Sequence, residues 1–211
     1  MVKSEVVIRT GEADLEGLLV LPEEALGIVA FAHGSGSSRF SPRNNYVAGI
    51  LNEAGIGTLL LDLLTREEDR DYDMRFDIAL LTKRLIDATA WLQEREDTKH
   101  LKIGYFGAST GAASALKAAS ALGKKISAVV SRGGRPDLAS PQELAKVLCP
   151  TLFIVGGLDD VVIELNKSAY LHLGCRREMK IIPGATHLFE ETGALEKVAF
   201  EARQWFKLHI A

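Results

Sequence analysis

The ten residues 104–113, GYFGASTGAA, decide how the middle of this chain folds. They follow a short apolar run and lead into an alanine-rich segment, which predicts a strand that turns directly into a helix. A glycine-rich turn of this kind can cradle a phosphate group or present a serine as a nucleophile. The two interpretations place different chemistry at the same position.

The glycine spacing argues against a phosphate-binding loop. A dinucleotide fingerprint needs G-x-G-x-x-G after a strand, with an acidic residue about 20 residues later. Here the glycines fall as G-x-x-G-x-x-x-G in mid-chain, and the next predicted strand ends in Ser131 and Arg132. A P-loop needs a following Gly-Lys-Ser/Thr, which this stretch lacks. The sequence therefore argues against a nicotinamide-dependent reductase.

The same stretch fits the nucleophile elbow pattern G-x-S-x-G, with Ser109 between Gly107 and Gly111. In such an elbow the serine occupies a strained turn, and the residues two positions away must be tiny because strand and helix pass closely. The turn lifts the Ser109 hydroxyl above the sheet and directs the Thr110 N–H toward the same point. The pattern predicts a catalytic serine with one oxyanion donor beside it.

Two later residues could complete a catalytic triad with Ser109. Asp159 follows one predicted strand, and His187 follows the next. The order Ser, Asp, His matches this architecture, and ligands gather at the carboxyl ends of parallel strands. Asp160 is the neighbouring alternative to Asp159, and we interpret it as the N-cap of the helix that follows.

A glycine-rich loop, FAHGSGSSRFSPRN at residues 31–44, is the expected source of the second oxyanion donor. Small residues in such a loop let the backbone approach a substrate carbonyl. The N–H of Ser35 is the first choice for this donor and the N–H of Gly36 is the second. Gly36 is accordingly also a candidate substrate-binding residue.

Arginines give the only indication of the charge on a substrate. Arg39 and Arg43 follow the glycine-rich loop, and Arg132 and Arg135 follow another strand end. Paired guanidinium groups at the pocket mouth would suit a carboxylate or phosphate, which makes Arg39 and Arg132 candidate substrate-binding residues. The alternative is that these arginines tie loops to backbone carbonyls or to the acidic segment REEDRDYD at residues 66–73.

The alternation of strand-like and helix-like segments predicts an α/β fold. Short apolar runs alternate with longer helical stretches from about residue 27, which is typical of a mainly parallel sheet with helices on both faces. Two earlier runs separated by TGEAD predict an antiparallel hairpin, and the charged segment 65–77 predicts a solvated loop. Strands are expected at 4–9, 15–21, 27–32, 57–64, 102–106, 126–131, 151–156 and 178–182, and helices at 42–55, 77–95, 110–122, 161–174 and 194–209.

Bulk properties narrow the class of protein. The 211 residues, 47% of them hydrophobic, suit a single domain over 1–211. A formal charge of -3 gives no basic surplus for a nucleic-acid partner. No apolar run approaches the ~20 residues of a membrane span, and the acidic N-terminus does not resemble a signal peptide, so we expect a cytoplasmic protein. Cys149 and Cys175 lack C-x-x-C spacing, which favours free thiols over a disulfide or zinc site.

With these motifs in place, the sequence resembles the α/β-hydrolase superfamily, and within it the small dienelactone-hydrolase-like enzymes. The resemblance runs over nearly the whole chain, from LEGLLVLP through HGSGSSR, GYFGASTGAA, VGGLDDVV and PGATHLFEE. It implies Ser109 as nucleophile, His187 as base and Asp159 as the acid that orients it. It also implies backbone oxyanion donors at Ser35 and Thr110.

One residue departs from the family pattern. Dienelactone hydrolase itself looks like a G-x-C-x-G enzyme, with cysteine at the elbow, whereas this chain has Ser109. The difference puts a lactone substrate in doubt and leaves the expectation of ester hydrolysis intact. A similar unit is attached to phosphoribosyltransferase-like domains in some proteins, and the sequence contains no such domain.

The expected function is therefore hydrolysis of short-chain acyl esters, or of a small anionic ester, by a serine esterase. No insertion of the size that builds a lid domain is seen, which favours a shallow pocket. We expect no cofactor and no metal, a small-molecule ester as substrate, and a monomer or homodimer. The alternative from another class is a non-catalytic protein that binds a small ligand on the same fold.

Overall fold

The computed structural model describes residues 1–210 and contains one eight-stranded sheet in the order β1-β2-β4-β3-β5-β6-β7-β8. β1 pairs antiparallel with β2 and β2 with β4, while the remaining neighbours are parallel. This confirms the mainly parallel sheet with an N-terminal hairpin. The strands are β1 Val2–Arg9, β2 Asp14–Leu21, β3 Gly27–Ala32, β4 Ile56–Leu61, β5 Ile103–Ala108, β6 Ile126–Arg132, β7 Thr151–Gly156 and β8 Arg177–Ile182.

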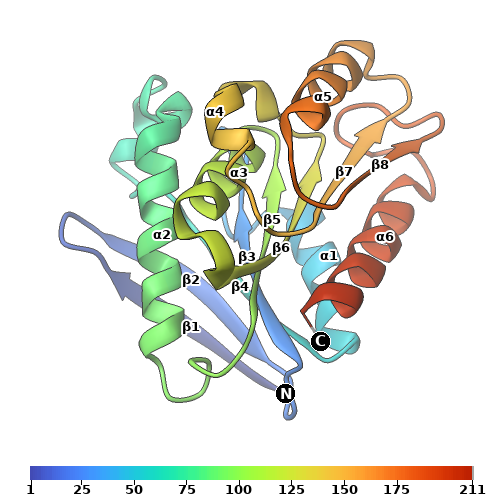
Figure 1. Ribbon diagram of the computed structural model, residues 1–211. Helices are drawn as coiled ribbons and strands as arrows, with labels where there is room; N and C mark the ends of the chain where they lie inside the picture. The colour runs from blue at the N-terminus through green and yellow to red at the C-terminus, as the bar shows by residue number, and fades with distance from the viewer. Residues whose placement is uncertain (211) are drawn as a thin grey trace.

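Helices cover both faces of the sheet, as the strand–helix alternation predicts (Figure 1). Helices α1 and α6 pack on one face, and α2 and α3 lie on the other with α4 and α5. The α-helices are α1 Pro42–Glu53, α2 Ile78–Glu94, α3 Thr110–Leu122, α4 Pro141–Leu144, α5 Asp160–His172 and α6 Ala194–His209; the short 3₁₀ turns are η1 Glu68–Arg70, η2 Met74–Phe76, η3 Gly123–Lys125 and η4 Pro136–Leu138.

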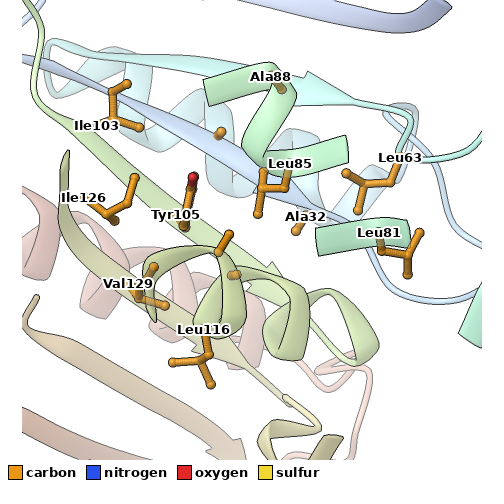
Figure 2. Packing of buried hydrophobic residues seen from close by; sticks show 14 of the residues in the cluster. Ala32, Leu63, Leu81, Leu85, Ala88, Ile103, Tyr105, Leu116, Ile126 and Val129 are labelled. Carbon is orange, nitrogen blue, oxygen red and sulfur yellow. The ribbon is translucent and has the colours of Figure 1, made fainter. Parts of the chain in front are cut away.

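The two faces carry separate hydrophobic cores. Figure 2 shows the core under α2 and α3, where Leu85 of α2 and Leu116 of α3 lie near Tyr105 and Val129 of the sheet, and Leu81 of α2 lies near Leu63. Strands β3, β4, β5 and β7 are buried along their whole length because helices cover both of their faces. The central strands therefore give rigid support to the loops that follow their carboxyl ends. Within residues 1–210, no helix is long and apolar enough to cross a membrane.

The charged segment 65–77 is solvated, as its composition predicts, since none of its residues is buried. It contains the two short turns η1 and η2. Glu68 of η1 accepts a hydrogen bond of 3.0 Å from Arg84, whose side chain is only 2% exposed. Arg84 also donates to the Thr10 hydroxyl in the turn of the N-terminal hairpin. One buried guanidinium thus ties the charged segment and the hairpin to α2, which the local sequence does not reveal.

Candidate active site

The turn that carries Ser109, which we call the nucleophile turn after the role predicted for its serine, lies where β5 ends and α3 begins, near the middle of the sheet. Ser109 occupies it with φ 51° and ψ −122°, a conformation that residues other than glycine rarely adopt. The Ser109 N–H donates to the Arg132 carbonyl, and the Ser109 carbonyl accepts from the Arg135 N–H at 3.0 Å. Two neighbouring backbone contacts therefore hold the strained turn in place.

The glycines on either side are required by close packing. A Cβ on Gly111 would lie 2.1 Å from the Ala32 carbonyl oxygen at the end of β3, and one on Gly107 would lie 2.4 Å from the Ala112 Cα. Both distances are shorter than any real carbon contact, so no side chain fits at either position. The elbow pattern read from the sequence is thus matched by its packing.

Asp159 and His187 meet on the same edge of the sheet. The His187 Nδ1 lies 2.6 Å from Asp159 Oδ2, and the two side chains are 37% and 16% exposed. Asp159 follows β7 and His187 follows β8, and the Leu158 N–H donates to the Ala185 carbonyl between the two loops. A carboxylate at Nδ1 leaves the other ring nitrogen, Nε2, available as a base.

The loop that carries His187 is fixed by a residue that the sequence analysis did not select. Both the N–H and the hydroxyl of Thr186 donate to the carboxylate of Glu191, at 3.1 and 2.6 Å. These hydrogen bonds keep the pKa of Glu191 below its ordinary value. Glu191 thereby sets the backbone next to the histidine. Its place four residues after His187 in the sequence gives no signal of this role.

The segment 132–135 contacts Ser109 and also lies against His187. A Cβ on Gly133 would lie 3.5 Å from the His187 Cε1, and Arg135 contacts the Ser109 carbonyl. Across residues 1–210, no hydrogen bond joins the Ser109 hydroxyl to His187. Hydrogen bonds between nucleophile and base are often long or poorly aligned in ligand-free enzymes and tighten when substrate binds.

We call residues 33–40, which carry the proposed second oxyanion donor, the His-Gly loop. The loop packs on the nucleophile turn, since a Cβ on Gly34 would lie 3.0 Å from the Ser109 Cβ. The Ser35 N–H donates to the Thr110 hydroxyl at 2.9 Å. Gly36 has φ 67° and stands in a turn closed by a hydrogen bond from the Ser37 N–H to the Gly34 carbonyl.

His33 anchors the base of this loop, a role that the sequence analysis did not assign. Its Nε2 accepts the Leu63 N–H at 3.1 Å, and its Nδ1 lies 2.9 Å from the Gly34 carbonyl. An acceptor at Nε2 and a donor at Nδ1 describe one neutral tautomer. Burial keeps the pKa of His33 below its ordinary value of 6.5, although the Gly34 carbonyl, Asp62 and Asp69 act in the opposite direction.

The two candidate arginines lie in different surroundings. The Arg39 guanidinium pairs with Asp62 and with Glu16, and its N–H also donates to Asp62, so this residue ties the His-Gly loop to β2 and to the end of β4. Arg39 therefore ties the loop, but to carboxylates outside the acidic segment that the sequence analysis named. Arg132 is 6% exposed and donates to Asn44, with burial and the nearby Arg43 lowering its pKa to about 10.

A cavity of about 230 Å³ opens beside the His-Gly loop. Its walls include Phe40 and Leu64, the carboxylates of Asp62 and Asp69, and the hydroxyl-bearing Ser37. The cavity adjoins the loop, but none of Ser109, Asp159 and His187 lines it, so it is not the space around the Ser109 hydroxyl.

Among the described residues, the other histidines, cysteines and carboxylates do not form a metal site or a disulfide. In the part of the chain that the structure describes, no group of three or more His, Cys, Asp or Glu side chains is placed to hold a metal ion. Both cysteines are free, and burial raises the pKa of the Cys149 thiol to about 12. The interpretation of Asp160 as a helix cap is wrong: α5 begins at Asp160, and Asp159 stands in the cap position with its side chain turned to His187.

Comparison with known proteins places the chain in a family. The model of the dienelactone hydrolase family matches residues 15–208, which is nearly the whole chain. The chain belongs to the dienelactone hydrolase family. The solved structure of a dienelactone hydrolase from Anabaena variabilis is 54% identical, with a TM-score of 0.97 over 99% of this chain and 98% of that one. This family member thus has the α/β-hydrolase fold, and a hydrolase is the function that its relatives support.

More distant and longer relatives add to the comparison. Est1E from Butyrivibrio proteoclasticus is 17% identical with a TM-score of 0.82, covering 97% of both chains, and this likeness concerns the fold alone. Two curated proteins from Mycobacterium tuberculosis, whose names carry the words phosphoribosyl transferase, are 54% identical over 206 residues. This dienelactone hydrolase family chain spans 46% of their length, so the matched region is about half of each relative.

Proposed function

We propose that the protein is a serine esterase that hydrolyses small carboxylic esters through Ser109, His187 and Asp159. The observation that carries the proposal is the pairing of two features on one sheet edge. Ser109 is held in a strained turn at the start of α3, and His187 is oriented by Asp159 at 2.6 Å. A ligand-binding protein has no need of both features, whereas acyl transfer uses each of them.

The proposed reaction proceeds in two acyl-transfer steps. His187 Nε2 takes the proton of the Ser109 hydroxyl while the oxygen attacks the ester carbonyl, and Asp159 stabilises the imidazolium that forms. The N–H groups of Thr110 and Ser35 stabilise the oxyanion. The alcohol leaves with the proton from His187, and an acyl-enzyme remains on Ser109. Water activated by His187 then releases the acid and restores the serine.

We propose short acyl chains as substrates. The strands are joined by single helices and short turns, and in the described residues no inserted lid domain lies over the sheet edge that carries Ser109, which favours a shallow site and short acyl chains. An anionic group on the substrate is the further possibility that Arg132 supports, because in the described part of the chain its guanidinium contacts the Asn44 amide and no carboxylate. Arg39 offers less support, since its charge is already paired with Asp62 and Glu16.

The first test is hydrolysis of p-nitrophenyl acetate, butyrate, hemisuccinate and octanoate by the wild type and by Ser109→Ala. Loss of the nucleophile is expected to lower kcat to the background rate, a loss on the order of a millionfold at most. Ser120→Ala, in the same helix but away from the turn, is the matched control and should keep full activity. Octanoate should be the poorest of the neutral esters.

Equal rates in the wild type and in Ser109→Ala would contradict the proposal. Ser109 would then be a structural turn residue, and a small-ligand-binding protein would be the better interpretation. Much faster turnover of octanoate than of acetate or butyrate would contradict the substrate class alone.

A further inference from the structure

The hydroxyl of Thr110 has a contact that the proposed reaction does not use. Thr110 is the first residue of α3, directly after Ser109, and it is 3% exposed. Its backbone N–H is one of the first N–H groups of the helix, which have no partner within the helix. Its side-chain oxygen instead accepts the Ser35 N–H, 75 positions earlier in the sequence, at 2.9 Å.

The direction of the Ser35 N–H is set by its own acceptor and by the Gly34 carbonyl, which belongs to the same planar peptide unit. Ser35 stands between Gly34 and Gly36, two residues whose backbone is the least restricted of any. The Gly34 carbonyl accepts the Ser37 N–H at 3.1 Å and lies 2.9 Å from His33 Nδ1. These two contacts hold the carbonyl side of the peptide unit. The Thr110 hydroxyl holds its N–H side, next to the turn that carries Ser109.

We infer that the Thr110 side chain is a positioning residue, which holds the Ser35 N–H ready for the oxyanion before the substrate is bound. The inference rests on the proposed esterase function. A single residue then governs both donors, the first by its own N–H and the second through its hydroxyl. When the oxyanion forms, the Ser35 N–H gains a charged acceptor, and hydrogen bonds to ionised acceptors are about twice as strong as neutral ones.

The stiffness of the Thr110 side chain supports this role. Threonine is branched at Cβ and has few χ1 rotamers in a helix, and burial of Thr110 restricts it further. Donors that are already oriented need no reorganisation during the reaction, which is the source of their catalytic effect. A hydroxyl that merely competed with the oxyanion for the Ser35 N–H would have the opposite effect on rate.

The test compares Thr110→Val, which removes the hydroxyl and keeps the shape, with Thr110→Ser, which keeps the hydroxyl. Neither changes the backbone N–H of residue 110. In Thr110→Val we expect kcat for p-nitrophenyl butyrate to fall about tenfold with KM within about twofold, because only the transition state is affected. Binding of phenylboronic acid, a mimic of the tetrahedral intermediate, should weaken by about the same factor. Thr110→Ser should restore both quantities.

Thr89→Val is the control that separates a loss of stability from a loss of donor positioning. It removes a different buried helix hydroxyl, which donates to the Leu85 carbonyl of α2. It should lower thermal stability without changing kcat or boronate binding. Thr110→Ala serves as a smaller replacement if the valine variant does not fold. Unchanged kcat in Thr110→Val and Thr110→Ala would overturn the inference, and so would a higher kcat with tighter boronate binding. A wild type without Ser109-dependent turnover would instead refute the esterase function itself.

Discussion

The backbone of Ser109 has an energetic cost that can be measured. A non-glycine residue with φ 51° and ψ −122° costs on the order of 1–3 kcal/mol, which the surrounding contacts must offset. Ser109→Gly relieves this strain, whereas Ser109→Ala keeps it, and both remove the hydroxyl. We therefore expect the glycine variant to be more stable than the alanine variant by about 1 kcal/mol in urea unfolding, after the entropy cost of glycine.

Both variants should be equally inactive on p-nitrophenyl butyrate. If Ser109→Gly were no more stable than Ser109→Ala, the turn would not be strained in solution, and the turn's match to a nucleophile elbow would lose its main physical support.

Local sequence predicts the identity of site residues better than their partners. Ser109, Asp159 and His187 could be selected because each follows a strand, and strand ends are readable from apolar runs. Arg39 and Arg132 also follow strands, and their sequence surroundings look alike. Only the fold brings Asp62 and Glu16 to Arg39 and leaves Arg132 with Asn44, so the division of their roles could not be predicted.

Among the elements, the junction of β3, β5 and α3 allows the least change. Gly111→Ala would place a methyl group 2.1 Å from the Ala32 carbonyl oxygen, in backbone that cannot move without breaking β3 from the sheet. We expect this variant to unfold or to express as insoluble protein. Gly49→Ala is the matched control, because a Cβ at this exposed position in α1 meets nothing within 4 Å.

The control should be stabilised by up to about 1 kcal/mol, since alanine favours helix more than glycine does. Thermal unfolding of both variants checks the pair. A Gly111→Ala protein with wild-type stability would contradict the packing of α3 against β3.

Element boundaries were predictable where apolar runs end abruptly in turn residues. The strands 27–32 and 151–156 and the helix 194–209 are confirmed residue for residue. Predictions were incomplete where distant contacts are involved. The segment 65–77 is solvated as its charges predict, but the pairing of Glu68 with the buried Arg84 could not be read from it. Helix α5 begins at Asp160, and the Asp159 side chain in the cap position contacts His187.

For the whole molecule, His33 makes stability depend on pH. Its pKa is lower in the folded state than its ordinary value of 6.5, mainly through burial, so the unfolded chain binds this proton more readily. The stability that the neutral His33 contributes is therefore fully present above about pH 6.5 and is lost as the pH falls below that value. The charged groups Asp62 and Asp69 face His33 and limit the size of the effect.

We expect the free energy of unfolding in urea to be lower at pH 5.5 than at pH 7.5, and this difference to shrink in His33→Gln. His209, whose pKa burial and Arg176 also lower, contributes in the same direction, so His209→Gln measures its separate share. A pH dependence that is unchanged in His33→Gln would show that the ring is not kept neutral by its surroundings.

The buried thiol of Cys149 can be used to measure how often the fold opens. Only a thiolate attacks alkylating reagents, and a group with a pKa of about 12 is almost never ionised at neutral pH. Iodoacetamide should therefore modify this sulfur only in molecules that have opened, and opening exposes the loop directly before β7, the strand that precedes Asp159. The rate of alkylation then reports how often the structure that supports Asp159 opens.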